Sequence, residues 1–158
     1  MMPWEVYIDP YPTAVAQTGF DGLTNPGSYN ANNPVAATGW KRQGTAAQNN
    51  LIAWDVVLSA GEWSMEALYS TSTDCAIITV ALDDGEGFVN IDQAPYGGSV
   101  ATIDTYSAAL TNNVRTSITG ITIPTTGKYR LRFMAATKNA SSSNYQVNLN
   151  RIRWLRTT

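Results

Sequence analysis

The C-terminal two thirds of this sequence alternate apolar and polar side chains, and that alternation restricts the fold more than any other feature. The clearest case is residues 128–133, where large apolar residues occupy every second position and cations the others: Tyr129, Leu131 and Phe133 against Lys128, Arg130 and Arg132. A period of two residues is typical of a β-strand with one buried and one solvated face. No segment shows a sustained 3.6-residue apolar stripe, so we expect almost no helix.

The same period predicts strands along the rest of this region. Ile52–Leu58 and Trp63–Tyr69 flank the turn Ala60-Gly61, which predicts a hairpin. The apolar run Ala76–Leu82 fits a central strand that ends at the turn residues Asp83-Asp84-Gly85. Shorter strands are expected at 88–91, 101–105 and 117–123. Seven or eight short strands separated by turns predict an all-β jelly-roll sandwich of two antiparallel sheets.

The last predicted strand, 145–155, changes parity part-way. Its apolar residues are odd-numbered up to Leu149 and even-numbered at Ile152 and Trp154. A β-bulge near Asn150–Arg151 explains this shift. Four aromatic residues occupy core positions of their strands and are predicted to be structural: Trp54, Trp63, Tyr129 and Trp154.

Residues 1–50 differ from the rest and are predicted to form an extended N-terminal arm, with the jelly roll at 51–158. Five of the seven prolines fall in this segment, and proline cannot donate to the interior of a sheet. Large apolar residues are nevertheless embedded in it, which a disordered tail rarely carries. We expect the arm to bury them chiefly on neighbouring subunits, the alternative being that Glu5–Ile8 adds an edge strand to its own sandwich. The candidate contact residues for a ligand or a subunit are Trp4, Tyr7, Tyr11 and Trp40.

Charge is segregated along the chain although the net charge is only −2. All 12 acidic residues precede position 105, and eight of the ten basic residues follow it. One interpretation is that early strands pair with late strands, so that the charges meet inside one sandwich. The other is complementarity between subunits or with an acidic partner. The sequence pI of about 4.9 argues against a nucleic-acid partner, and no apolar run is long enough for a membrane span.

The residue inventory argues against an enzyme. There is no histidine, and Cys75 is the only cysteine, at the start of a strand that looks buried. Asp55 and Glu66 could face each other across the predicted hairpin, but both are on polar strand positions and a solvated face explains them. A calcium site is conceivable at Asp83, Asp84, Glu86 and Asp92, but plain turn chemistry explains these residues too. We therefore predict no catalytic residues, no metal and no cofactor.

One aromatic residue outside the arm is a further candidate for binding. Tyr96 lies in the loop Pro95-Tyr96-Gly97-Gly98, and we expect the tip of such a loop to leave the ring exposed. It is therefore predicted to contact a ligand or a neighbouring subunit.

Three blocks of the sequence resemble a domain that recurs in tailed-phage virion proteins, often at the C-terminal end of tail-fibre-like polypeptides. They are Leu58–Ser70, then Ala76–Asp84 with Ile103–Ala108, and Ile118–Tyr145, the most specific. Residues 86–99 depart from the pattern and look like an insertion. The resemblance implies a jelly roll similar to carbohydrate-binding modules.

The resemblance also implies a function and partners. We expect a structural bacteriophage virion protein on the virion surface, a capsid decoration or accessory subunit. The alternative is a tail-fibre-type or glycan-binding module that aids adsorption to the host. The expected partners are further copies in a homo-oligomer, a trimer by expectation, the major capsid or another virion protein, and a host-surface glycan.

Overall fold

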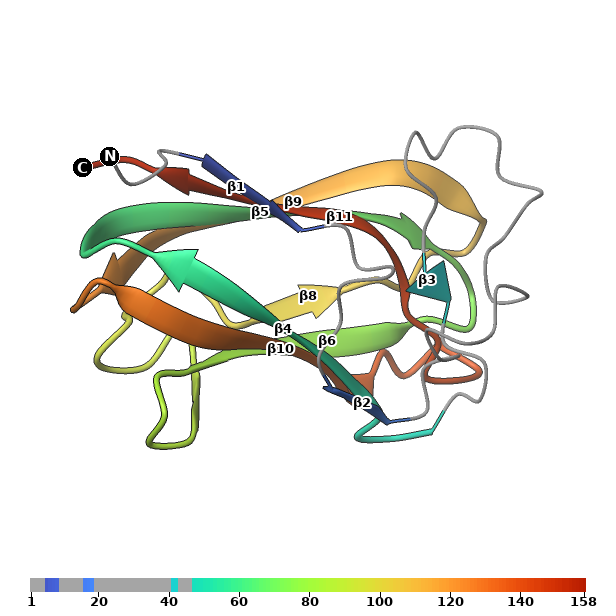
Figure 1. Ribbon diagram of the computed structural model, residues 1–158. Coiled ribbons are helices and arrows are strands. Elements are labelled where there is room, and N and C mark those ends of the chain that lie inside the picture. The colour runs from blue at the N-terminus through green and yellow to red at the C-terminus, as the bar shows by residue number, and fades with distance from the viewer. Residues whose placement is uncertain (1–4, 9–15, 19–40, 43–46) are drawn as a thin grey trace.

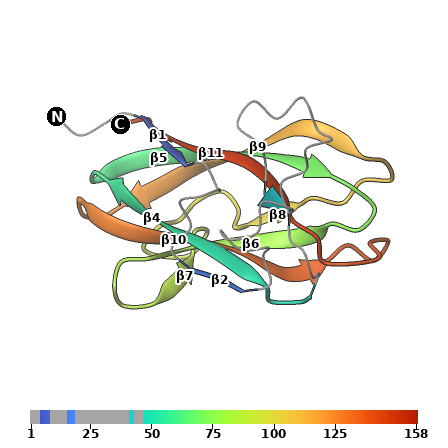
Figure 2. The ribbon, with the colours of Figure 1, turned by 45° about the vertical axis from the view of Figure 1, so that its right-hand side comes forward.

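The computed structural model describes residues 5–8, 16–18, 41–42 and 47–158, and this part of the chain is an all-β sandwich (Figure 1). Eleven strands are assigned in these residues, and their named pairings are all antiparallel. They form two sheets that face each other, as two views of the ribbon show (Figures 1 and 2). The described residues contain no helix, and so none that could cross a membrane. The predicted jelly-roll sandwich of two antiparallel sheets is confirmed.

The order of strands in each sheet mixes early and late parts of the chain. The first sheet has the order β1 (Glu5–Ile8), β11 (Asn148–Arg156), β5 (Gly61–Thr71), β9 (Thr111–Ile123), and β3 (Lys41–Arg42) also pairs with β11. The second has the order β2 (Ala16–Thr18), β4 (Leu51–Leu58), β10 (Gly127–Lys138), β6 (Ala76–Asp83), β7 (Phe88–Asn90), and β8 (Thr102–Asp104) also pairs with β6. Most contacts are therefore between residues far apart in the sequence.

The core lies between the sheets and is built by the inward half of each alternating strand. The four aromatic residues predicted to be structural are all at most 2% exposed. Trp54 and Phe133 pack edge to face with ring centroids 5.6 Å apart, and the Trp63 indole donates to the Ser59 carbonyl oxygen at 2.9 Å. Burying one such side chain contributes about 1.5–3 kcal/mol, so this layer dominates the stability of the fold.

The predicted hairpin between Ile52–Leu58 and Trp63–Tyr69 is wrong. β4 pairs with β10 and β2, whereas β5 pairs with β11 and β9, so the turn at Ala60-Gly61 carries the chain from one sheet to the other. A hairpin and a crossover between sheets would show the same period of two in the sequence. Only the pairing of β4 with β10 and of β5 with β11 distinguishes the crossover from the hairpin. The bulge expected near Asn150–Arg151 is confirmed, because the register of β11 against β5 shifts between Leu149 and Arg151.

The three strands described within residues 1–50 belong to the sheets of their own chain. β1 forms the edge of the first sheet, with Ile8 opposite Ile152 and Tyr7 opposite Arg153. Ile8 is 6% exposed and joins the core, so the expectation that this side chain is buried on another subunit is wrong. The edge-strand alternative for Glu5–Ile8 is the one observed.

The segregated charges meet within the sandwich. Asp55 pairs with Arg130 at 2.9 Å and with Lys128 at 3.5 Å, and Glu5 pairs with Arg153. These contacts join acidic residues of the early strands to basic residues of the late ones. The interpretation that the charges meet inside one sandwich is confirmed for these pairs.

Candidate functional site

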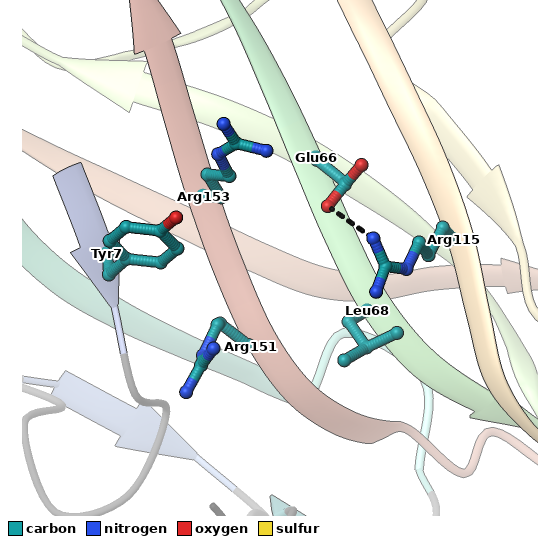
Figure 3. Close-up of a pocket in the computed structure, with 6 residues that line it drawn as sticks. All are labelled: Tyr7, Glu66, Leu68, Arg115, Arg151 and Arg153. Atoms are coloured by element: carbon teal, nitrogen blue, oxygen red, sulfur yellow. Dashed lines mark ion pairs between the residues drawn. The ribbon is translucent and has the colours of Figure 1, made fainter. Parts of the chain in front are cut away.

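The outer face of the first sheet carries a group of polar and aromatic side chains, which we call the Tyr7 site (Figure 3). The register of the paired strands places these side chains next to one another. Arg153 of β11 lies opposite both Tyr7 of β1 and Glu66 of β5, so these three side chains form one row across the sheet. A second row is set by Leu68 of β5, which lies opposite Arg151 of β11 and Arg115 of β9. Neighbouring strands are about 4.8 Å apart, so side chains in each row are in reach of one another.

Alternation along each strand explains why these side chains point away from the core. On β11, Ile152 and Trp154 are fully buried, and the arginines at 151 and 153 occupy the opposite face. On β5, Met65 and Ala67 are fully buried, and Glu66 and Leu68 are outward. The bulge at position 150 matters here, because it turns Arg151 and Arg153 to the outward face although the odd-numbered residues before it, Val147 and Leu149, are buried in the core.

The Tyr7 ring is the aromatic element of the site. It is 54% exposed, and the guanidinium carbons of Arg151 and Arg153 lie 5.5 and 5.9 Å from its centroid. Both distances are within the range of a cation–π interaction. Both arginines lie on the β11 side of the ring, as Figure 3 shows, and the exposed fraction of Tyr7 means that part of its ring is open to solvent.

The charges of the site are only partly neutralised. Arg115 Nη1 is 3.6 Å from Glu66 Oε1, and Arg153 donates to Glu5 from a guanidinium whose pKa is raised by that hydrogen bond. Among the described residues, no carboxylate lies within ion-pair distance of Arg151. The hollow lined by the six residues of the Tyr7 site has a volume of about 160 Å³. That is below the range of about 300–1,000 Å³ of enclosed ligand pockets, so the site suits one substituent or ring of a larger ligand.

A second hollow of about 290 Å³, which we call the Asp55 site, lies on the second sheet and the turn after β6. Its charged side chains are those of Asp55, Asp83, Asp84, Lys128 and Arg130. The hydrogen bond from Arg130 Nε at 2.9 Å lowers the pKa of Asp55 below its usual value, so this carboxyl is ionised and poorly suited to act as a general acid. Its aromatic residue, Tyr129, is 2% exposed and offers no open ring face.

Several of the carboxylates considered for calcium and for catalysis have partners within the chain. Asp83 Oδ1 accepts hydrogen bonds from the backbone N–H groups of Gly85 and Gly87, at 2.7 and 2.8 Å, which is the turn chemistry of this loop. Within the described residues, no three His, Cys, Asp or Glu side chains are placed to hold a metal ion. Asp55 and Glu66 do not face each other, because β4 and β5 belong to different sheets.

The expectation that Tyr96 is exposed is wrong. The side chain is 1% exposed, and its ring packs edge to face with Tyr129 at a centroid distance of 6.4 Å. The loop folds back over the open end of the sandwich: the Gly98 N–H donates to the Ile91 carbonyl oxygen at 2.7 Å, and the Thr122 N–H donates to the Tyr96 carbonyl oxygen at 2.7 Å. Burial raises the pKa of Tyr96 to about 12. The ring closes the core and cannot contact a ligand in this conformation.

The remaining candidates divide between one that the structure places in the site and three that it does not describe. Tyr7 lies in the site described above. Trp4, Tyr11 and Trp40 lie outside the described residues. Sequence reasoning missed Arg115, Arg151, Arg153 and Leu68, and it considered Glu66 only as a carboxylate opposite Asp55. The signal that could have found part of them is the i, i+2 pair of arginines on the last strand, directly after the predicted bulge.

Comparisons with known proteins bear on the fold. No protein-family model and no curated protein matches the chain. Among solved structures, the C-terminal CBM6 of the laminarinase LamC from Zobellia galactanivorans is 14% identical, with a TM-score of 0.54, over 96% of this chain and 99% of that one. The carbohydrate-binding module CBM6cm-2 from Cellvibrio mixtus lichenase 5A, in complex with cellotriose, is also 14% identical, with a TM-score of 0.51, over 97% and 98%.

A third match is to part of a larger enzyme. A Paenibacillus xanthan lyase is 16% identical, with a TM-score of 0.58, and the alignment covers 94% of this chain but 13% of the lyase. At such low identities these likenesses show the fold. The chain has the jelly-roll sandwich found in carbohydrate-binding modules. None of these three descriptions mentions a phage particle, so the virion role, the surface location and the trimer stay predictions.

Proposed function

We propose that this chain is a non-catalytic carbohydrate-binding module and that the Tyr7 site on the first sheet contacts its ligand. The observation that carries the proposal is the half-exposed Tyr7 ring, set among outward polar side chains on a sheet face. The fold supports it, since structures that match the chain end to end are described as carbohydrate-binding modules.

The chemistry of the site fits a saccharide better than an apolar ligand. A sugar ring has apolar C–H faces, which can stack on an aromatic ring, and hydroxyl groups around its edge, which need hydrogen-bond partners. Tyr7 supplies the ring, while the guanidinium groups of the site supply N–H donors and Glu66 supplies an acceptor. The shallow hollow favours a chain lying across the sheet over a molecule enclosed by the protein.

A glycan array and affinity electrophoresis of the full chain test this function. Tyr7→Ala should weaken binding about fivefold, because an aromatic contact is worth about 1 kcal/mol. Tyr7→Phe retains the ring and should bind nearly as well as the wild type.

The matched control is Phe88→Ala, which removes a partly exposed aromatic side chain from the second sheet. Phe88→Ala should leave the affinity unchanged. Loss of binding in Phe88→Ala but not in Tyr7→Ala would move the site to the other sheet. Absence of binding to any saccharide by the folded protein at millimolar concentration would refute the function.

A further inference from the structure

We propose that the saccharide bound at the Tyr7 site is anionic and carries carboxylate or sulfate groups. This inference rests on the proposed function and names its ligand class. The observation behind it is the charge of the lining: three arginines stand against one glutamate, an excess of two positive charges. Glu5, which pairs with Arg153 at the rim, reduces this excess without cancelling it.

The local charge is opposite to that of the protein as a whole. The chain has a net charge of −2 and a sequence pI of about 4.9, yet the Tyr7 site is positive. The Asp55 site shows the contrast, since its three aspartates outnumber its two cations. A general attraction of anions to the surface is therefore not expected, and a positive hollow on a negative protein would direct an anion to one place.

Two of the three arginines of the site, Arg151 and Arg115, are available to bind a ligand. Arg151 has a tyrosine ring beside it and, among described residues, no ion-pair partner. The Arg115 side chain is 65% exposed, and its 3.6 Å contact with Glu66 is of the kind that contributes little in water. An incoming carboxylate or sulfate could therefore be bound without breaking a strong internal contact.

Arginine is also the side chain best matched to these groups. The planar guanidinium presents parallel N–H donors to the two oxygens of a carboxylate or to two oxygens of a sulfate, and such charge-assisted hydrogen bonds are roughly twice as strong as neutral ones. Because the Arg151 guanidinium lies 5.5 Å from the centroid of the Tyr7 ring, one anionic group could contact Arg151 while the sugar ring that carries it stacks on Tyr7. Uronic acids and sulfated sugars have this combination of ring and charge.

Pairs of polysaccharides with the same backbone but different charge separate the effect of charge on binding from the effect of the sugar backbone. Polygalacturonate is compared with its highly methyl-esterified form, which lacks most of the negative charge, and dextran sulfate is compared with dextran. Binding is measured by isothermal titration and affinity electrophoresis at low and at moderate salt. We expect the protein to bind at least one charged member more tightly than its neutral counterpart, with an affinity that falls as salt increases. The charged member that binds identifies carboxylate or sulfate.

Three single-residue variants locate the interaction. Arg151→Gln should weaken binding of the charged member about tenfold or more, as expected for loss of a hydrogen bond to a charged group. Arg151→Lys keeps the positive charge but loses the parallel N–H donors of the guanidinium. Its affinity should fall between those of Arg151→Gln and the wild type. Lys128→Gln is the matched control, because it removes one exposed positive charge from the second sheet, and it should bind as the wild type does.

The outcomes distinguish this inference from the proposed function. Equal or tighter binding of the neutral members would overturn the anionic ligand and leave the carbohydrate-binding function standing. An equal loss of affinity in Lys128→Gln and Arg151→Gln would overturn the assignment to the Tyr7 site, because it would indicate diffuse electrostatic attraction. Failure to bind any saccharide, charged or neutral, would refute both.

Discussion

Replacing Ile8 with alanine should destabilise the folded protein, because this residue ties the first strand of the chain to the core. Ile8 is 6% exposed and lies opposite Ile152 at the edge of the first sheet. The substitution removes three carbons, and about 0.8 kcal/mol for each buried methylene gives a loss of about 2.4 kcal/mol. A small cavity term raises this to about 3 kcal/mol, limited by the ease with which an edge strand can collapse onto its neighbour.

Urea unfolding followed by tryptophan fluorescence measures this loss directly. For a chain of this size about 3 kcal/mol corresponds to a fall in melting temperature of about 6–12 °C, which calorimetry checks independently. The control is Tyr7→Ala, one residue away on the outward face. It should change the free energy of unfolding by less than about 1 kcal/mol.

The two variants together test whether the N-terminal strand belongs to its own sandwich. If Ile8→Ala unfolds with the same urea midpoint as the wild type, β1 is not docked on β11 in solution. The row that joins Tyr7 to Arg153 would then not form, and the reasoning that places Tyr7 in the site would be refuted.

Three further predictions follow from local contacts. Burial raises the pKa of the Cys75 thiol to about 12, so the native protein should not react with iodoacetamide at pH 8 and should react once unfolded in urea; native reactivity would contradict the buried position. The hydrogen bond from Arg130 lowers the pKa of Asp55 in the folded protein. The stability that this hydrogen bond contributes is therefore present above the pKa of Asp55 in the unfolded chain, about 3.9, and is lost as pH falls through its pKa in the folded protein. Asp55→Asn should thus lower the free energy of unfolding, measured in urea, at pH 7 by no more than about 1 kcal/mol, and its difference from the wild type should shrink as pH falls below about 3.9. Gly98→Ala would place a Cβ 2.8 Å from a backbone carbonyl oxygen and should cost about 1–3 kcal/mol, whereas Gly127→Ala, with open space around its Cβ position, should be neutral by calorimetry; equal melting temperatures would show that the loop over Tyr96 is not packed as described.

The sequence was sufficient to predict the strands and the fold class because both depend on local patterns. The alternation around Leu131 predicts β10, and the change of parity after Leu149 predicts the bulge in β11. The partners of each strand were less predictable. β4 and β5 look like a hairpin on local evidence, but their hydrogen bonds go to strands about 30 to 90 residues away. Long-range pairing of this kind leaves no mark in the spacing of apolar residues.

The candidate site was predictable only in part for the same reason. Tyr7 stood out because an aromatic residue in a proline-rich segment needs a surface to contact. Arg115, Glu66 and Arg151 looked like ordinary solvated positions of separate strands, and only the register across the sheet brings them together. Tyr96 was predicted to be a site residue but is buried. The hydrogen bonds that fold its loop over the core come from residues that no local pattern connects to it.

The edge position of β1 has a consequence for how binding and dynamics are linked. The aromatic ring of the site is carried by a four-residue strand with a neighbour on one side only, and such edges open locally at a lower free energy than the rest of a sheet. Detachment of these residues would remove the ring while the two sheets remain folded. By mass action, a ligand that needs the ring holds the strand in place by about 2.7 kcal/mol at a hundred times its dissociation constant. Amide hydrogens of Glu5–Ile8 would then exchange more slowly when saccharide is bound, which makes the N-terminus of the chain a reporter of occupancy.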